Sequence, residues 1–168
     1  MSTEEAPFPA RTPAAEALTA LMLEVFRVNG DLLAQGNRLT KAVGQTSARW
    51  QILGAIRSPK SVAAIARERG LARQSVQRTA DLLAAEGLVE YTENPAHRRA
   101  KLVRLTPLGQ EILGDITQAQ IAWANALADA MPAGEAEIRQ ALAVLRQLRA
   151  ELETVKRPRE AQASAATH

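Results

Sequence analysis

The stretch from Gly70 to Thr106 constrains the fold more than any other part of this chain of 168 residues. Its apolar residues first recur at helical spacing, which predicts an amphipathic helix over about Arg73–Glu86 that ends at Gly87. Its apolar face is predicted to carry Val76, Ala80 and Leu83. Residues 88–93 and 101–105 then alternate like two strands, with a turn between them. A helix followed by a two-stranded hairpin is typical of the second half of a winged helix-turn-helix.

The first half of such a motif lies just upstream. Ser61 is placed to cap a short helix over Val62–Arg69, and Gly70 follows it as a left-handed C-cap would. Another helix is predicted near Ser47–Arg57, where it stops before a proline. We therefore predict that residues 46–106 form a winged helix-turn-helix lobe in a mainly α chain with a small β-wing.

Long helices are predicted on both sides of this lobe, over residues 14–45 and 107–155. The last of them carries a heptad seam, which is typical of a coiled coil and needs a partner helix. We interpret 14–45 and 107–155 as a helical dimerisation lobe, although the partner could also be a helix of the same chain. Its interface residues are predicted to be Leu18, Ile138, Leu145, Leu148 and Leu152. The tails 1–13 and 156–168 are expected to be disordered.

The charge of the chain is unevenly distributed. The formal net charge is +3, and residues 57–106 contain ten basic and five acidic side chains, so this segment alone carries +5. The rest of the chain carries −2. A basic excess that coincides with a helix-turn-helix indicates a polyanionic partner, double-stranded DNA above all, while scattered solvated charge is the alternative interpretation.

The start of the predicted helix Arg73–Glu86 is the first candidate contact with DNA. An arginine can pair with guanine and a glutamine with adenine in the major groove, and a serine near a helix N-terminus suits a phosphate. The alternative is a solvated face on which Arg78 pairs with Asp81 or a neighbouring acid. The candidate DNA-binding residues here are Arg73, Gln74, Ser75, Gln77 and Arg78.

The hairpin turn is the second candidate contact. Arg98, Arg99 and Lys101 cluster beside His97, and a thin basic hairpin tip can enter the minor groove, where narrow stretches attract arginine. The alternative is a hairpin made basic for solubility or to protect its edges. His97 could make the tip sensitive to pH, and an ordinary exposed histidine is the simpler interpretation.

Two aromatic residues, Phe26 and Trp50, fall on apolar helix faces. Core packing is the default interpretation of such residues. The other interpretation is a pocket for a small apolar or aromatic effector where the long helices meet the DNA-binding lobe.

The chain lacks the residues that several other functions need. The chain has no cysteine, which excludes disulfides and thiol redox sensing through this chain. Its two histidines are too few and too far apart to suggest a metal site. With no nucleophile–base constellation and no phosphate-binding glycine loop, we expect neither enzymatic activity nor a cofactor. No signal pattern or membrane-spanning run is visible, so a cytoplasmic location without membrane contact is expected.

Three stretches together carry a more specific signal: SARWQILGAI at 47–56, the helix pair at 62–86 continuing into AAEGLVEY, and NPAHRRAKLVRLTPLG at 94–109. They resemble the MarR family of multiple-antibiotic-resistance-type regulators, over roughly Ala15–Val155. The resemblance implies a two-fold dimer built from the first, fifth and sixth helices. It also implies transcriptional repression, in many members relieved by small, often phenolic, effectors. The family wing commonly carries Asp-x-Arg, whereas this chain has His97-Arg98-Arg99, so the arginine is kept and the aspartate is replaced.

The sequence thus predicts a homodimeric, sequence-specific DNA-binding regulator acting on a pseudo-palindromic operator, with a small-molecule effector as a further candidate partner. A winged-helix module for protein–protein interaction, whose basic face binds an acidic partner, is the alternative. The salt dependence of DNA binding would distinguish the two.

Overall fold

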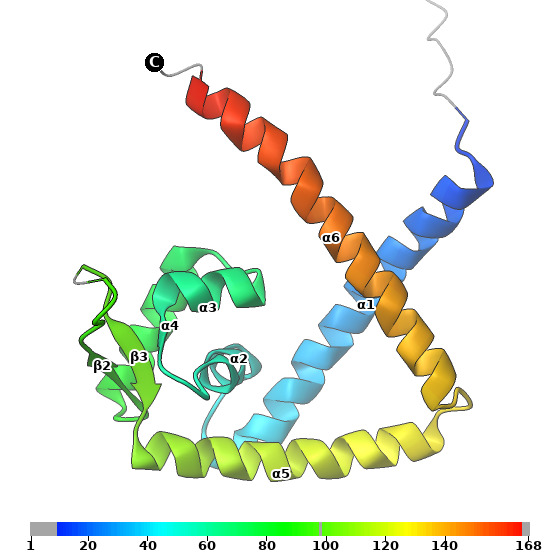
Figure 1. Cartoon of the computed structure of the whole chain (residues 1–168). Coiled ribbons are helices and arrows are strands. Elements are labelled where there is room, and N and C mark those ends of the chain that lie inside the picture. The colour runs from blue at the N-terminus through cyan, green and yellow to red at the C-terminus, as the bar shows by residue number, and fades with distance from the viewer. Residues whose placement is uncertain (1–9, 98, 166–168) are drawn as a thin grey trace, which may run out of the picture. The chain divides into compact units, whose positions relative to one another are not determined.

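The computed structural model describes residues 10–97 and 99–165, with side chains up to residue 154. The chain forms two compact units, one up to Gln120 and one from Ile121 onward. Figure 1 shows mostly helices and one small sheet. The elements are α1 (Pro13–Thr40), a 3₁₀ turn η1 (Lys41–Val43), α2 (Ser47–Ala55), β1 (Lys60–Ser61), α3 (Val62–Arg69), α4 (Arg73–Ala85), β2 (Val89–Thr92), β3 (Leu102–Leu105), α5 (Pro107–Ala130) and α6 (Glu135–Ala165).

Threonine and serine side chains fix where several helices begin. The hydroxyl of Ser61 accepts a hydrogen bond from the Ala64 N–H at 3.3 Å, and that of Thr106 accepts one from the Gly109 N–H at 3.0 Å. Each bond satisfies a backbone donor that the first turn of a helix would otherwise leave unpaired. The cap predicted at Ser61 is therefore confirmed, and Thr106 caps α5 in the same way.

The turn between α3 and α4 depends on a glycine. Gly70 has a φ of 65°, in the left-handed region that other residues rarely adopt. The following N–H, of Leu71, donates to the Ala66 carbonyl at 2.9 Å and closes the end of α3. This geometry confirms the predicted C-cap, and it brings α4 directly after α3 as a helix-turn-helix requires.

The sheet has three antiparallel strands in the order β1-β3-β2. Val89 lies opposite Leu105 and Tyr91 opposite Val103, so β2 and β3 form the predicted hairpin. The sequence analysis missed β1, in which Lys60 pairs with Val103. Two residues are too short to show the alternation by which a strand is predicted.

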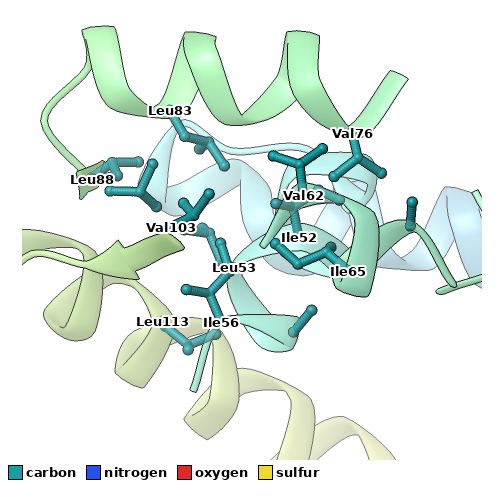
Figure 2. Close-up of a cluster of buried hydrophobic side chains, with 13 residues drawn as sticks. Ile52, Leu53, Ile56, Val62, Ile65, Val76, Leu83, Leu88, Val103 and Leu113 are labelled. Atoms are coloured by element: carbon teal, nitrogen blue, oxygen red, sulfur yellow. The ribbon is translucent and has the colours of Figure 1, made fainter. Parts of the chain in front are cut away.

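The core of the first unit lies between α2, α3, α4, the hairpin and the start of α5. Figure 2 shows side chains from these elements gathered in one cluster, with Val76 and Leu83 of α4 above Ile52 and Leu53 of α2. Val76, Ala80 and Leu83 are fully buried, which confirms the face predicted for α4. Because these side chains fix α4 on its apolar side, its opposite side faces solvent.

Gly36 and Gly109 mark two close approaches of the backbone. A Cβ at Gly109 would lie 1.9 Å from the Leu88 carbonyl oxygen, and one at Gly36 would lie 2.6 Å from the Ser47 hydroxyl. Beside Gly36, the Asn37 side-chain oxygen accepts a hydrogen bond from the Ser47 N–H at 2.7 Å. Through these contacts α5 packs against Leu88, the residue before β2, and α1 packs against Ser47 at the start of α2.

The two predicted tails can be compared with the structure only in part. The tail predicted over 156–168 is wrong for residues 156–165, because α6 continues to Ala165. Glutamate, glutamine, alanine and arginine dominate this segment and favour helix even without an apolar face, although Pro158 cannot donate a backbone hydrogen bond. Residues 166–168 lie outside the described residues. At the other end α1 begins at Pro13, and residues 1–9 of the predicted N-terminal tail are not described.

Candidate nucleic-acid interface

The residues predicted at the start of α4 all lie on its solvent side. Arg73, Gln74, Ser75, Gln77 and Arg78 are exposed, whereas Val76 between them is fully buried. No side chain caps this helix, because Ala72 occupies the N-cap position. The first backbone N–H groups of α4 are therefore not satisfied by a cap, and they add the positive end of the helix dipole to the basic side chains.

The wing is held by its backbone and by Asn94. The Asn94 side-chain oxygen accepts a hydrogen bond from the Ala96 N–H at 3.0 Å, and its carbonyl accepts one from the His97 N–H at 3.1 Å. The His97 carbonyl in turn accepts a bond from the Ala100 N–H at 3.0 Å. These hydrogen bonds fix the backbone on both sides of His97. Arg99 and Lys101 are exposed, and Arg98 lies outside the described residues.

The helix start and the wing lie around one cavity of about 410 Å³. Three cations line it, together with one carboxylate, an amide and a phenol. These six side chains are Arg73, Arg99, Lys101, Asp81, Gln77 and Tyr91. The structure therefore brings the two predicted contact regions together within the first unit.

A hydrogen-bond triad connects α4 to β2 inside this cavity. The Tyr91 hydroxyl donates to Asp81 Oδ1 at 2.6 Å. The Gln77 Nε2 donates to Asp81 Oδ1 and to the Tyr91 oxygen, both at 2.9 Å. Partial burial and the adjacent Asp81 carboxylate raise the pKa of Tyr91 to about 12. The phenol is therefore protonated, and a donor, throughout the neutral range.

This triad was not predicted from the sequence. Asp81 was predicted only as a possible partner of Arg78, whereas it accepts hydrogen bonds from Gln77 and Tyr91. The spacing of four residues between Gln77 and Asp81 on one helix could have indicated their contact. No local signal could have placed Tyr91, because its position depends on the hairpin packing against α4.

Ion pairs occupy most of the acidic residues of the basic lobe. Lys60 Nζ lies 2.5 Å from Glu68, and this hydrogen bond lowers the pKa of the Glu68 carboxyl. Glu86 pairs with Arg49 at 2.7 Å, and Glu90 pairs with its cross-strand neighbour Arg104 at 2.7 Å. None of these pairs uses a predicted DNA-binding side chain, so the basic excess of the interface is not neutralised by them.

The two residues predicted to bind an effector lie in different environments. Trp50 is partly buried against the core, which confirms the core-packing interpretation for this residue. Phe26 is 73% exposed, so core packing within the chain is wrong for Phe26. Neither lines a second cavity of about 530 Å³, which is bounded by Ile56, Arg57 and Leu113 among others. The effector assignment remains a prediction.

The residues predicted to form the dimer interface are largely uncovered in the single chain. The exposed fractions are 42% for Leu18, 41% for Ile138, 39% for Leu145 and 50% for Leu152, while Leu148 is partly buried. Leu142 and Val144, which lie off the predicted seam, are exposed as well. An apolar helix surface of this kind needs a partner, and the identity of that partner stays a prediction.

The described residues contain no group of three or more acidic, histidine or cysteine side chains placed to hold a metal ion. None of the helices they form is long and apolar enough to cross a membrane.

The fold and the site define a winged helix-turn-helix protein with a basic surface formed by α4 and the wing. A sequence model described as MarR family matches residues 44–100. An uncharacterized protein of Mycobacterium tuberculosis is 38% identical over 117 residues, which cover 69% of this chain and 82% of that protein.

Solved structures agree in fold. A mutant MarR from E. coli, crystallised with operator DNA, superposes with a TM-score of 0.69 at 21% identity, covering 79% of this chain and 95% of that chain. Staphylococcus aureus MarR in complex with salicylate and kanamycin gives 0.70 at 18% identity, covering 83% and 95%. The chain belongs to the MarR family, whose members are transcription regulators and not enzymes.

Proposed function

We propose that this protein is a homodimeric repressor that binds a pseudo-palindromic operator in double-stranded DNA. The observation that carries the proposal is the arrangement of α4. Its apolar face is locked into the core, and its polar N-terminal half lies next to a basic wing across one cavity. A rigid helix with exposed arginine and glutamine suits the major groove, and a basic hairpin tip suits the adjacent minor groove.

The proposed contacts follow from position and chemistry. Arg73, Gln74, Gln77 and Arg78 face base edges from α4, and Ser75 donates to a phosphate near the helix N-terminus. Arg99 enters the minor groove, with Arg98 beside it. Lys101 lies at the end of the wing where it meets the backbone of DNA.

The proposed dimer rests on the uncovered apolar helix surface. Leu18, Leu145 and Leu152 are each at least 39% exposed in the single chain, although they are large and apolar. A second copy would cover them by two-fold symmetry and present two recognition helices to two half-sites.

A small-molecule effector is proposed as a further partner. S. aureus MarR was crystallised with salicylate and kanamycin. We propose that a small molecule bound near Trp50 changes the distance between the two recognition helices, so that the protein releases its operator. The proposed location of the regulator is the cytoplasm. The ligand would shift the equilibrium only by its difference in affinity for the two states.

In vitro selection of random duplex DNA tests the proposal. An enriched inverted repeat with half-sites one helical turn apart, about 34 Å, is expected for a dimer docking two helices. Binding should weaken steeply with salt, with a log–log slope near −0.9 for each phosphate contacted. No enrichment at low or moderate salt, with a shallow salt dependence, would favour a protein-binding role instead.

A further inference from the structure

The wing leaves the sheet from its outer strand. In the order β1-β3-β2, β3 has a neighbour on each side, whereas β2 is paired only with β3. The hydrogen bonds of Asn94 and of the His97 carbonyl give the wing tip its shape. They join residues of the wing to one another, so they do not set the direction in which the wing points relative to α4. That direction depends on how β2 packs against α4.

Tyr91 makes this contact one residue before β2 ends. Its ring packs against the core, and its hydroxyl donates to Asp81 Oδ1 at 2.6 Å, the length expected of a hydrogen bond between a hydroxyl and a carboxylate. Among the residues that the structure describes, only the triad of Gln77, Asp81 and Tyr91 joins α4 to the hairpin strands through side-chain hydrogen bonds or ion pairs. The raised pKa of Tyr91 agrees with a phenol that holds its proton against the carboxylate.

The triad does not use up the side chains that are proposed to contact DNA. Its two acceptors lie 2.6 Å apart and each 2.9 Å from Gln77 Nε2, so a single N–H group of the amide serves both. The other N–H and the carbonyl of Gln77 are left for a base edge. Asp81 lines the same cavity as Arg99, although no ion pair joins these two residues in the described part of the chain. The carboxylate therefore acts on Arg99 through the position of the wing and not through a direct bond.

Resting on the proposed function, we infer that Asp81 and Tyr91 are positioning residues that set the direction of the wing from α4 and so place Arg99 in the minor groove. The helix and the wing then dock onto DNA as one body. Without the Tyr91 hydroxyl the hairpin keeps its strands but loses its fixed direction, and part of the binding free energy is used to order the wing again.

A double-mutant cycle of Tyr91→Phe with Arg99→Ala on the selected operator tests this inference. Tyr91→Phe removes one hydroxyl and no charge, so it leaves the electrostatic attraction to DNA unchanged. We expect it to weaken binding about fivefold in the wild-type background, the factor given by one net hydrogen bond. In the Arg99→Ala background it should weaken binding less than about twofold, because the contact that the wing presents has been removed.

Thr92→Val is the matched control. It removes the neighbouring hydroxyl on β2, which forms no hydrogen bond with any other described residue, and it should bind the operator as the wild type does. Circular dichroism melting establishes that each variant is folded.

Footprinting of the saturated complexes separates a positioning role from a general loss of structure. Hydroxyl radicals report protection in the minor groove, and dimethyl sulfate reports protection of guanine N7 in the major groove. In the Tyr91→Phe complex the minor-groove protection beside each half-site should be lost, whereas the major-groove protection under α4 is retained. Asp81→Ala should give the same pattern, and alanine at this exposed helix position favours the fold.

Four results would overturn the inference while leaving the operator intact. They are an equal loss of affinity for Tyr91→Phe in both backgrounds, wild-type affinity of the Tyr91→Phe protein, a wild-type complex without minor-groove protection, and protection that the variants lose equally in both grooves. Failure of the wild type to bind any specific operator would instead reject the proposed function itself, and the inference with it.

Discussion

At the scale of single residues, the apolar and polar sides of α4 were predictable because they follow from periodicity alone. Val76, Ala80 and Leu83 are buried as expected, and the five predicted contact residues are exposed. The partners of the polar residues were not predictable. Tyr91 reaches Asp81 only because the hairpin folds back onto α4, and sequence spacing does not encode that approach.

Arg78→Ala should weaken binding to the selected operator by about 1–3 kcal/mol and relax preference at one position, because a base contact would be lost. Fluorescence anisotropy on the operator and on a scrambled duplex measures both effects. Arg139→Ala, which removes an exposed cation from α6, is the control. Equal losses of affinity on the two duplexes would show that Arg78 contacts only a phosphate.

Gly109 and Gly114 form a natural pair for a stability test, since both lie in α5. Gly109→Ala should destabilise the fold by roughly 1–3 kcal/mol, because its Cβ would collide with the Leu88 carbonyl oxygen. Gly114→Ala should stabilise it by roughly 0.5–1 kcal/mol, since its Cβ would meet no atom within 4 Å and alanine favours helix. Urea unfolding measures the free energy of unfolding of the two variants. Equal changes in this free energy would contradict the packing described for the start of α5.

At the scale of elements, the order of helices and the hairpin was predictable, and their long-range pairings were not. Ser61, Gly70 and Thr106 carry local capping signals that require no knowledge of the tertiary structure. The pairing of Lys60 with Val103 joins residues far apart in sequence through a strand of two residues. The helical continuation of α6 beyond Val155 was not predictable from the apolar seam, because the seam ends there although the helix does not.

The contact between α4 and β2 can be followed through the pKa of Tyr91, which is the single tyrosine of the chain. Its pKa is raised from 10 to about 12, first by burial and then by Asp81, so the folded state holds the proton more tightly than the unfolded state. This contribution to stability is complete below about pH 10 and is lost as the pH rises toward 12.

An absorbance titration of the phenolate, with helicity monitored in parallel, measures this pKa directly. Asp81→Asn should lower the midpoint toward 10 while leaving the part due to burial. An identical midpoint in the two proteins, both still helical, would show that the carboxylate does not act on Tyr91 as described.

At the scale of the whole molecule, the family and the mainly helical architecture follow from the sequence. The oligomeric state does not follow from the sequence, because the apolar seam of α6 could be covered by a helix of this chain or by a second copy. We propose that a second copy covers it, and a single substitution tests this proposal.

Leu145→Asp should convert the dimer to monomer at micromolar concentration, since it places a charge in an apolar interface without a partner. Gln147→Asp adds the same charge at an exposed position outside the seam and should remain dimeric. Light scattering coupled to size-exclusion chromatography reports the mass of each. A dimeric Leu145→Asp protein would place the interface on another surface.

We propose that two copies of this winged helix-turn-helix read one specific DNA site. The most direct test of this proposal is equilibrium binding of the purified protein to its selected operator and to a scrambled duplex of equal length at physiological salt. We predict two chains per operator and an affinity at least about 10³-fold higher than for the scrambled duplex. Affinities that agree within a few-fold for the two duplexes, or one chain per operator at saturation, would contradict it.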